Sequence, residues 1–371
     1  MKLNTDSLKY LIALQSVPGI GNITARQLIA YLGDAKAIFE EKPQNLQKIH
    51  GIGPLLSSNI KKKNYLALAE NELEFIEKYN IQAHTFLDQF YPKRLKQCDD
   101  APLVLFQKGN KDLNKAIHIS IVGTRKATEY GKHYCQKIIT ELKEKGMQPV
   151  IISGLAYGVD SCAHKAAIDN QLETWAVLGH GLDRIYPAQH KNLAKQILEN
   201  GSLISEFAHG TFPAPSNFIS RNRIIAGLSD LTIVVESAKK GGSLVTADFA
   251  FNYNREVMAI PGRIGDSKSE GCNFLIKTQK ANVLESVQDI IYTMAWDQKT
   301  QLNKSIQLNL FEQLDKEQSQ LFKFLQENED SSIDEIVKKS GLEKTKIPVL
   351  LLDLELLSLI KVLPGKRYHA L

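Results

Sequence analysis

The run Gly123-Thr-Arg125 carries the clearest chemical signal in this chain. It follows an apolar, β-branched segment at 117–122 and precedes a predicted helix that begins near Glu129. The first strand-to-helix turn of an α/β domain is a common phosphate site. A dinucleotide site would carry G-x-G-x-x-G there, whereas this turn has one glycine, a threonine and an arginine. The run predicts a phosphate site approached by a cationic side chain; the alternative is an ordinary turn with a solvated arginine.

A second cationic group follows, where Arg221 and Arg223 flank Asn222 at the predicted start of a helix spanning 221–228. Cations at a helix N-terminus oppose the helix dipole, so their presence there favours an anion bound between them. The alternative is pairing with a carboxylate, for which Glu206 is the candidate. Phe218 precedes the arginines, and it could stack on a base or fill the core beneath its loop.

The ends of the other predicted strands carry glycine and small hydroxyl residues. Ser153 and Gly154 follow one strand, and Gly242 and Ser243 lie in the turn after another. Ligands of an open α/β sheet bind at the carboxyl ends of its strands, so we assign these four residues to the same candidate site.

No group of residues matches a hydrolytic or redox centre. A phosphoribohydrolase on this scaffold would place a glutamate shortly after its glycine-rich turn, and the matching segment here, 241–248, offers only Asp248. Asp160 and His164 lie four residues apart but are too few to bind a metal, so Asp160 is predicted as a helix N-cap and His164 as a packed side chain. We therefore expect no catalytic residue, no metal and no cofactor, and a nucleotide hydrolase is the alternative.

Composition bounds the class of protein. The 371 residues are 43% hydrophobic and 23% charged, with a net charge of +5, which permits a polyanionic partner without requiring one. The four cysteines contain no C-x-x-C pair, which favours reduced thiols in a cytoplasmic protein. No stretch reaches 18 apolar residues and no cleavable leader is evident, so neither secretion nor membrane insertion is expected.

The central part of the chain alternates between strand and helix patterns. Strands are predicted at 117–122, 148–152, 174–178, 202–205, 231–235 and 256–260. Helices are predicted at 129–145, 159–169, 189–200, 221–228, 243–253 and 285–295. Several strands are almost wholly apolar, which suits a parallel sheet buried on both faces. The preceding segment, 81–115, looks irregular. These patterns predict an α/β fold with an extended Rossmann-like, doubly wound, mostly parallel sheet over 81–296.

Two further domains flank the sheet. Residues 1–80 are helical in pattern and contain two similar Gly-x-Gly turns, at 17–25 and 49–57, which predict a helix-hairpin-helix or SAM-like domain. Residues 297–312 are polar and are predicted as a linker. Residues 313–371 have three helical segments followed by a Pro-Gly turn between short apolar strands, which predicts a winged-helix-like domain. Its third helix is rich in leucine, which favours contact with protein over reading of DNA.

Taken in order, the motifs of 90–280 resemble those of the DNA-processing protein A (DprA, or Smf) family of natural transformation. The matching pieces are Tyr91-Pro-Lys-Arg-Leu, Val122-Gly-Thr-Arg, Ser153-Gly-Leu-Ala-Tyr-Gly-Val-Asp, Gly181-Leu-Asp-Arg-Ile-Tyr-Pro, Ser205-Glu, Arg221-Asn-Arg-Ile-Ile-Ala-Gly-Leu-Ser, Gly242-Ser-Leu-Val-Thr-Ala, Ile260-Pro-Gly and Gly271-Cys-Asn-Phe-Leu-Ile. Nine pieces in register make the resemblance specific.

The resemblance implies a homodimeric, non-enzymatic protein that binds and protects single-stranded DNA and helps to load the RecA recombinase. It also implies that Gly123, Thr124 and Arg125 form a phosphate pocket and that Phe218 stacks on a base. The segment Arg221-Asn222-Arg223 is implied to add to the pocket.

Overall fold

The computed structural model describes residues 5–61, 64–115, 117–296, 314–328, 330–357, 359–363 and 365–370. The chain divides into two compact units, Met1–Tyr253 with Val257–Asn282 and Asn254–Glu256 with Val283–Leu371. The predicted linker at 297–312 lies outside the described residues. No helix in the described ranges is long and apolar enough to cross a membrane.

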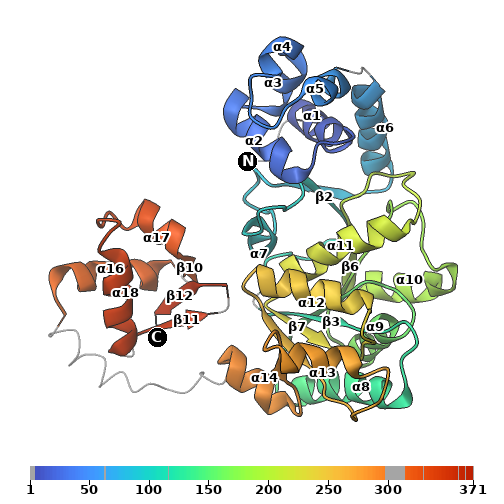
Figure 1. Ribbon diagram of the computed structural model, residues 1–371, viewed down its shortest axis with the longest axis vertical. Coiled ribbons are helices and arrows are strands. Elements are labelled where there is room, and N and C mark those ends of the chain that lie inside the picture. The colour runs from blue at the N-terminus through green and yellow to red at the C-terminus, as the bar shows by residue number, and fades with distance from the viewer. Residues whose placement is uncertain are drawn as a thin grey trace. The chain divides into compact units, whose positions relative to one another are not determined.

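A nine-stranded sheet organises the first unit (Figure 1). Its strands are β1 (Gln82–Thr85), β2 (Val104–Lys108), β3 (His118–Val122), β4 (Val150–Ser153), β5 (Thr174–Val177), β6 (Gly201–Ser205), β7 (Leu231–Val234), β8 (Glu256–Ala259) and β9 (Asn282–Val283). The order across the sheet is β1-β2-β6-β5-β4-β3-β7-β8-β9. The run from β6 to β7 in this order pairs in parallel. The predicted large, mostly parallel sheet is therefore confirmed, and all six predicted strands are present.

The expectation that 81–115 is irregular is wrong. This segment supplies β1 and β2, which extend the sheet in antiparallel fashion beside β6. Both strands are short, and β1 alternates weakly between exposed and buried residues, so neither has a strong period-two pattern.

The parallel strands are buried along their whole length because helices cover both faces of the sheet. The helices of this part are α7 (Lys93–Lys96), α8 (Glu129–Glu144), α9 (Val159–Asp169), the 3₁₀ turn η1 (Ala188–His190), α10 (Lys191–Glu199), α11 (Pro215–Leu228), α12 (Gly242–Asn252) and α13 (Glu270–Lys277). Helix α8 packs against α9, and α11 packs against α12. One core cluster joins Ile152 of β4, Trp175 of β5 and Ile224 of α11.

Helix α11 begins six residues earlier than the sequence pattern predicts. Its first residue is Pro215, a residue type favoured at the first position of a helix. Arg221 and Arg223 therefore lie in the middle of α11, and the prediction that they flank a helix N-terminus is wrong.

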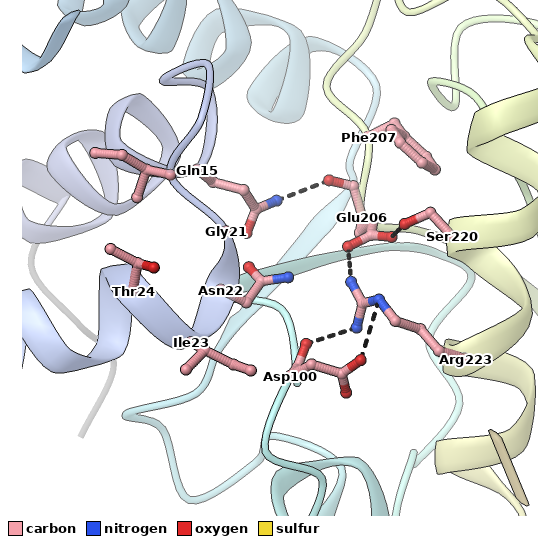
Figure 2. A pocket seen from close by; sticks show the side chains of 11 residues that line it. Gln15, Gly21, Asn22, Ile23, Thr24, Asp100, Glu206, Phe207, Ser220 and Arg223 are labelled. Carbon is pink, nitrogen blue, oxygen red and sulfur yellow. Dashed lines mark hydrogen bonds and ion pairs between the residues drawn. The ribbon is translucent and has the colours of Figure 1, made fainter. Parts of the chain in front are cut away.

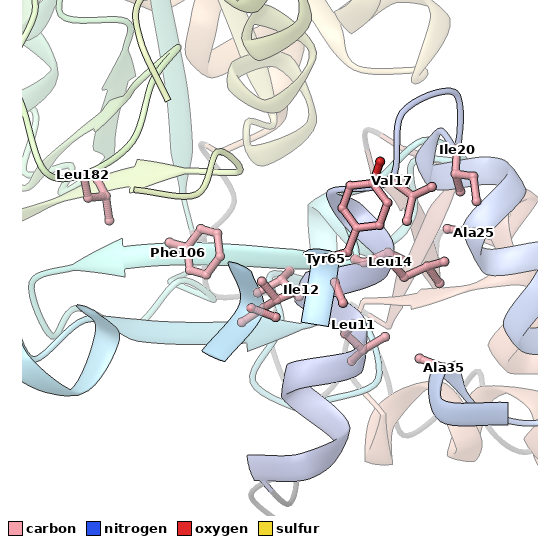
Figure 3. Packing of buried hydrophobic residues seen from close by; sticks show 14 of the residues in the cluster. Leu11, Ile12, Leu14, Val17, Ile20, Ala25, Ala35, Tyr65, Phe106 and Leu182 are labelled. Atoms are coloured by element: carbon pink, nitrogen blue, oxygen red, sulfur yellow. The ribbon is translucent and has the colours of Figure 1, made fainter. Parts of the chain in front are cut away.

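The N-terminal segment forms six helices that share a hydrophobic cluster with the sheet (Figure 3). They are α1 (Thr5–Gln15), α2 (Asn22–Leu32), α3 (Ala35–Glu40), α4 (Pro43–Leu46), α5 (Pro54–Ile60) and α6 (Asn64–Lys78). Leu11 and Leu14 of α1 belong to the same cluster as Phe106 of β2. Each predicted Gly-x-Gly turn lies between helices, and Gly21 and Gly53 precede the first residues of α2 and α5.

In its described residues, the second unit contains α14 (Val287–Met294), three further helices and a small sheet. Those helices are α16 (Lys316–Glu327), α17 (Ile333–Lys339) and α18 (Ile347–Leu356), and the strands are β10 (Ser331–Ser332), β11 (Ile360–Leu363) and β12 (Arg367–Ala370). The strands pair antiparallel in the order β10-β12-β11. Phe322, Leu351 and Ile360 are among the residues of its core.

Candidate nucleic-acid interface

A pocket of about 700 Å³ opens among the ends of β3 and β7 and the helices α11 and α12. It is lined by Val122, Gly123, Thr124, Arg125, Lys126, Ala156, Asp160, Tyr186, Pro213, Pro215, Phe218, Ile219, Arg221, Asn222, Ile225, Ser237, Ala238, Lys240, Gly241, Gly242, Ser243 and Thr246. These include eight of the eleven residues that the sequence assigns to one site. Ser153, Gly154 and Arg223 are the three that do not line it.

Backbone hydrogen bonds hold the turn that carries Arg125. The Thr124 amide donates to the Glu236 carbonyl oxygen at 2.8 Å, and the Val159 amide donates to the Thr124 carbonyl oxygen at 3.2 Å. Gly123 allows this close approach, since a Cβ there would lie 2.5 Å from a methyl carbon of Val159. The turn is therefore fixed to both β7 and the start of α9.

The Glu236 side chain secures the beginning of α8 beneath the same turn. Its carboxylate is buried and accepts hydrogen bonds from the Thr128 amide, at 2.9 Å, and from the Thr128 hydroxyl. Thr128 in turn caps α8 by accepting from the Gly131 amide at 3.2 Å. Sequence reasoning missed Glu236, although a glutamate directly after an apolar strand is a visible signal.

Three exposed cations line the pocket, namely Arg125, Lys126 and Lys240. The Arg125 guanidinium lies 5.6 Å from the centre of the Phe218 ring, a cation–π distance. None of the three forms an ion pair within the described part of the chain. The open part of the pocket therefore carries positive charge, and Asp160, the acidic residue of the lining, interacts with Arg125 only over a longer distance than an ion pair.

Arg221 lies deeper in the pocket wall and is only 4% exposed. Its Nη1 donates to the Gly154 carbonyl oxygen at 2.7 Å and also to the Val177 carbonyl oxygen. Burial lowers the pKa of Arg221 to about 10, which leaves it cationic at neutral pH, and Asp160 opposes that shift. Burial likewise raises the pKa of the Asp160 carboxyl, and Arg221 acts against it.

The buried Arg221 guanidinium explains the place of Gly154, and Ser153 is the residue before it. A Cβ on Gly154 would lie 2.5 Å from Nη1 of Arg221, so only glycine fits beneath the guanidinium. Ser153 is fully buried and donates from its hydroxyl to the Ile121 carbonyl oxygen at 2.6 Å. Both residues lie under the pocket and support its wall.

Arg223 belongs to a different cavity (Figure 2). It is 7% exposed, forms an ion pair with Glu206, and donates from Nη1 to the Asp100 carbonyl oxygen at 2.7 Å. This second cavity, of about 490 Å³, is lined by Arg223 and by residues of α2 such as Asn22 and Thr24. Residues two apart on a helix point about 200° away from each other, so Arg221 and Arg223 cannot both face one groove. The carboxylate pairing considered from the sequence is the arrangement that the structure shows.

The N-terminus of α12 lines the same pocket as the Arg125 turn. Gly241 precedes the helix without a side-chain cap, and both Gly242 and Ser243 line the pocket. The Ser243 hydroxyl donates to the Ser237 hydroxyl at 2.9 Å, and Asn222 donates to the Gly242 carbonyl oxygen at 3.3 Å. Amide groups at the start of a helix favour anions, as do the cations that line the same pocket.

Phe218 meets a second aromatic side chain that sequence reasoning missed. The ring of Tyr186 lies 5.6 Å from that of Phe218, tilted by 32°. Tyr186 is 48% exposed, while Phe218 is partly covered. The sequence offers Tyr186 only as part of a Tyr-Pro turn, and its place beside Phe218 follows from the tertiary fold.

The acidic residue required by the hydrolase alternative lies elsewhere. Asp248 does not line the pocket, and its carboxylate pairs with the Lys280 ammonium group at 2.7 Å. The described residues contain no group of three or more potential metal ligands. His164 is buried and its Nδ1 bonds the Thr174 hydroxyl at 2.7 Å, as predicted for a packed side chain, whereas Gly158, not Asp160, is the N-cap of α9.

The sequence of this chain matches one protein family over the region that forms the sheet and the pocket. The family described as DNA recombination-mediator protein A matches residues 82–295, which span the sheet and the pocket. This chain belongs to that family. Protein Smf of Synechocystis sp. is 30% identical over 97% of this chain and 98% of its own length. DNA processing protein DprA of Streptococcus pneumoniae is 42% identical over 56% of this chain and 72% of its own. The resemblance drawn from the motifs is thereby confirmed.

Two solved structures extend the comparison to the fold. The X-ray structure of DprA from Streptococcus pneumoniae matches with a TM-score of 0.65 and 33% identity, covering 79% of this chain and 98% of that one. DNA processing protein A from Helicobacter pylori matches with a TM-score of 0.52 and 31% identity, over 58% of this chain and 97% of that one. The Helicobacter pylori structure was solved to describe its single-stranded DNA binding mode.

Proposed function

We propose that this protein binds single-stranded DNA in the pocket, with one phosphate of a continuing strand at the Gly123-Thr124-Arg125 turn. The observation that carries the proposal is the exposed Arg125 guanidinium, which has no ion-pair partner in the described chain and lies over Phe218. A DNA phosphate would form the ion pair that Arg125 lacks, and the neighbouring bases would stack on the Phe218 ring. This combination binds a strand without reading its sequence.

The other residues assigned to the site from the sequence, and three that the structure adds, have the following parts in this proposal. Lys126 and Lys240 add positive charge, and Gly242 and Ser243 present the helix N-terminus to a neighbouring phosphate. Phe218 stacks on a base, together with Tyr186. The residues Ser153, Gly154, Arg221 and Asn222 shape the wall. Arg223, which lies outside the pocket, contributes to stability through its pair with Glu206 and takes no part in binding.

A mediator of recombination fits the chemistry better than a hydrolase does. Asp160 is the only acidic residue among the described residues of the pocket lining, and it is buried against Arg221. A general base needs an accessible carboxylate in reach of a bound substrate. Family membership and the single-stranded DNA binding of the Helicobacter pylori relative support the same choice.

We extend the proposal to the biological role of this DNA binding. The chain acts without catalysis in the cytoplasm, as a homodimer that protects incoming single strands and loads RecA recombinase onto them during natural transformation. The description of its family as a recombination mediator supports this role. The test measures the rate of RecA-promoted strand exchange on single-stranded DNA that is coated with a single-strand-binding protein. This protein should increase that rate.

We propose three domains for this chain. We assign 1–80 to a helix-hairpin-helix or SAM-like domain that packs on the sheet, 81–296 to the Rossmann-like domain and 313–371 to a winged-helix-like domain. The helix and strand order of the last segment supports its assignment. The exposed leucines of α18, Leu352 and Leu356, favour a protein partner for it.

The binding proposal is tested by replacing Arg125. Arg125→Ala should weaken binding of fluorescent oligothymidine and of mixed-sequence oligonucleotides alike. It should also reduce the slope of log affinity against log salt by about 0.7, the value for one phosphate contact on a single strand. Arg263→Ala, which removes an exposed arginine that does not line the pocket, is the control. An unchanged affinity and slope for Arg125→Ala would overturn the proposal.

A further inference from the structure

An exposed aromatic ring beside the pocket has a cation stacked on it. Phe212 is 70% exposed, and the Arg184 guanidinium carbon lies 3.9 Å from the centre of its ring. A large apolar side chain exposed to this degree contributes little to the core. The guanidinium covers one face of the ring, and the rest of the Phe212 side chain is open to solvent.

Hydrogen bonds fix this surface in place. The Asp183 carboxylate accepts from Nε of Arg184 at 2.9 Å and from Nη2 at 2.6 Å, which sets the plane of the guanidinium. The other oxygen of Asp183 accepts from the Gly210 amide at 3.0 Å. The Gly181 amide also donates to the Thr211 carbonyl oxygen at 3.2 Å, so the two loops are joined at two points.

The surface continues from the pocket along the chain. Pro213, the residue after Phe212, lines the pocket, and so does Tyr186, two residues after Arg184. Tyr186 is exposed and adjoins Phe218. Phe212 and Arg184 therefore lie one and two residues along the chain from residues that line the pocket.

We propose that the Arg184–Phe212 pair is a second base-stacking platform, which receives a base of the strand after it leaves the pocket. This inference rests on the proposed binding of single-stranded DNA. Bases stack on aromatic rings and on arginine planes regardless of sequence, but only when they are unpaired. Because Asp183 neutralises Arg184, the platform acts by stacking and adds no phosphate contact.

The stacking platform and the phosphate site therefore differ in how they affect the salt dependence of binding. Stacking of one base contributes about a five- to 150-fold gain in affinity, and it releases no counterions. Loss of the platform should therefore lower affinity without changing the salt slope. Loss of a phosphate contact at Arg125 lowers both the affinity and the salt slope.

The experiment compares oligothymidines of about 6 and about 20 nucleotides, each measured by fluorescence anisotropy at several salt concentrations. Phe212→Ala should weaken binding of the longer strand by about fivefold or more, with an unchanged salt slope, and leave the shorter strand unaffected. Phe212→Trp should retain wild-type affinity. Tyr292→Ala, which removes another exposed aromatic, is the control.

Several outcomes would overturn the platform. They are wild-type affinity of Phe212→Ala for both strands, equal weakening for both strands, or a changed salt slope. The proposed function fails separately, if the wild-type protein binds neither strand or if Arg125→Ala binds the shorter strand as the wild type does.

Discussion

Gly158 offers a substitution whose effect on the phosphate turn can be worked out from the backbone. It precedes α9 with φ 78° and ψ −122°, a conformation that glycine adopts readily and other residues rarely do. A Cβ at this position would lie 2.2 Å from the Thr124 carbonyl oxygen and 2.6 Å from the Arg125 carbonyl carbon. A carbon–oxygen contact needs about 3.3 Å, so the Thr124–Arg125 turn must move by about 1 Å.

Two effects of Gly158→Ala determine how far it lowers the free energy of unfolding. Backbone strain lowers the free energy of unfolding by about 1–3 kcal/mol. Displacing Thr124 weakens its hydrogen bonds to Glu236 and Val159, each worth about 1 kcal/mol. We expect a total loss of about 2–5 kcal/mol. The displaced turn also misaligns a charged hydrogen bond to phosphate, worth about 1.5–3 kcal/mol, so affinity for oligothymidine should fall about tenfold or more.

Gly146→Ala is the matched control. Gly146 has the same φ of 78°, but a Cβ there would have no atom within 4 Å. It should lose about 1–2 kcal/mol of stability and keep wild-type affinity. Affinity is measured by anisotropy at a temperature where circular dichroism shows all three proteins folded. Wild-type affinity in folded Gly158→Ala would refute the placement of DNA at the Thr124–Arg125 turn.

Two further predictions separate stability from binding. Glu206→Gln breaks the buried pair with Arg223 and should lower the free energy of unfolding by about 3 kcal/mol, measured by urea denaturation, while the folded variant binds oligothymidine as the wild type does. A loss of affinity above tenfold in a stably folded Glu206→Gln protein would show that Arg223 contacts the strand. Burial lowers the pKa of His164 to about 3 from its usual 6.5 or so. The unfolded chain therefore takes up the proton first, so this residue costs stability as the pH falls below about 6.5. Between pH 7.5 and 5 the wild type should lose about 2 kcal/mol more than His164→Asn, and equal losses would contradict the buried neutral imidazole.

The sheet was predictable from the sequence because its parallel strands are buried on both faces. Segments such as 231–234 are almost wholly apolar, a pattern typical of strands in a parallel sheet that is covered on both faces. Strands β1 and β2 were not predictable in the same way. Their place depends on pairing with β6, which lies far along the chain.

The pocket was only partly predictable. The Gly123–Arg125 turn follows directly from the strand before it, so its position was clear from local sequence. Assigning Arg221 and Arg223 to one groove failed because their helix begins at Pro215, and a helix turns neighbouring residues to different sides. Tyr186 approaches Phe218 only through tertiary packing, and no local pattern could reveal that contact.

The most direct test of the binding mode is a crystal structure of the protein with a short oligothymidine. We expect one phosphate within hydrogen-bond distance of the Arg125 guanidinium, near the N-terminus of α12, with a base against Phe218 or Tyr186. A strand bound on another surface, with the pocket around Arg125 empty, would contradict the central proposal.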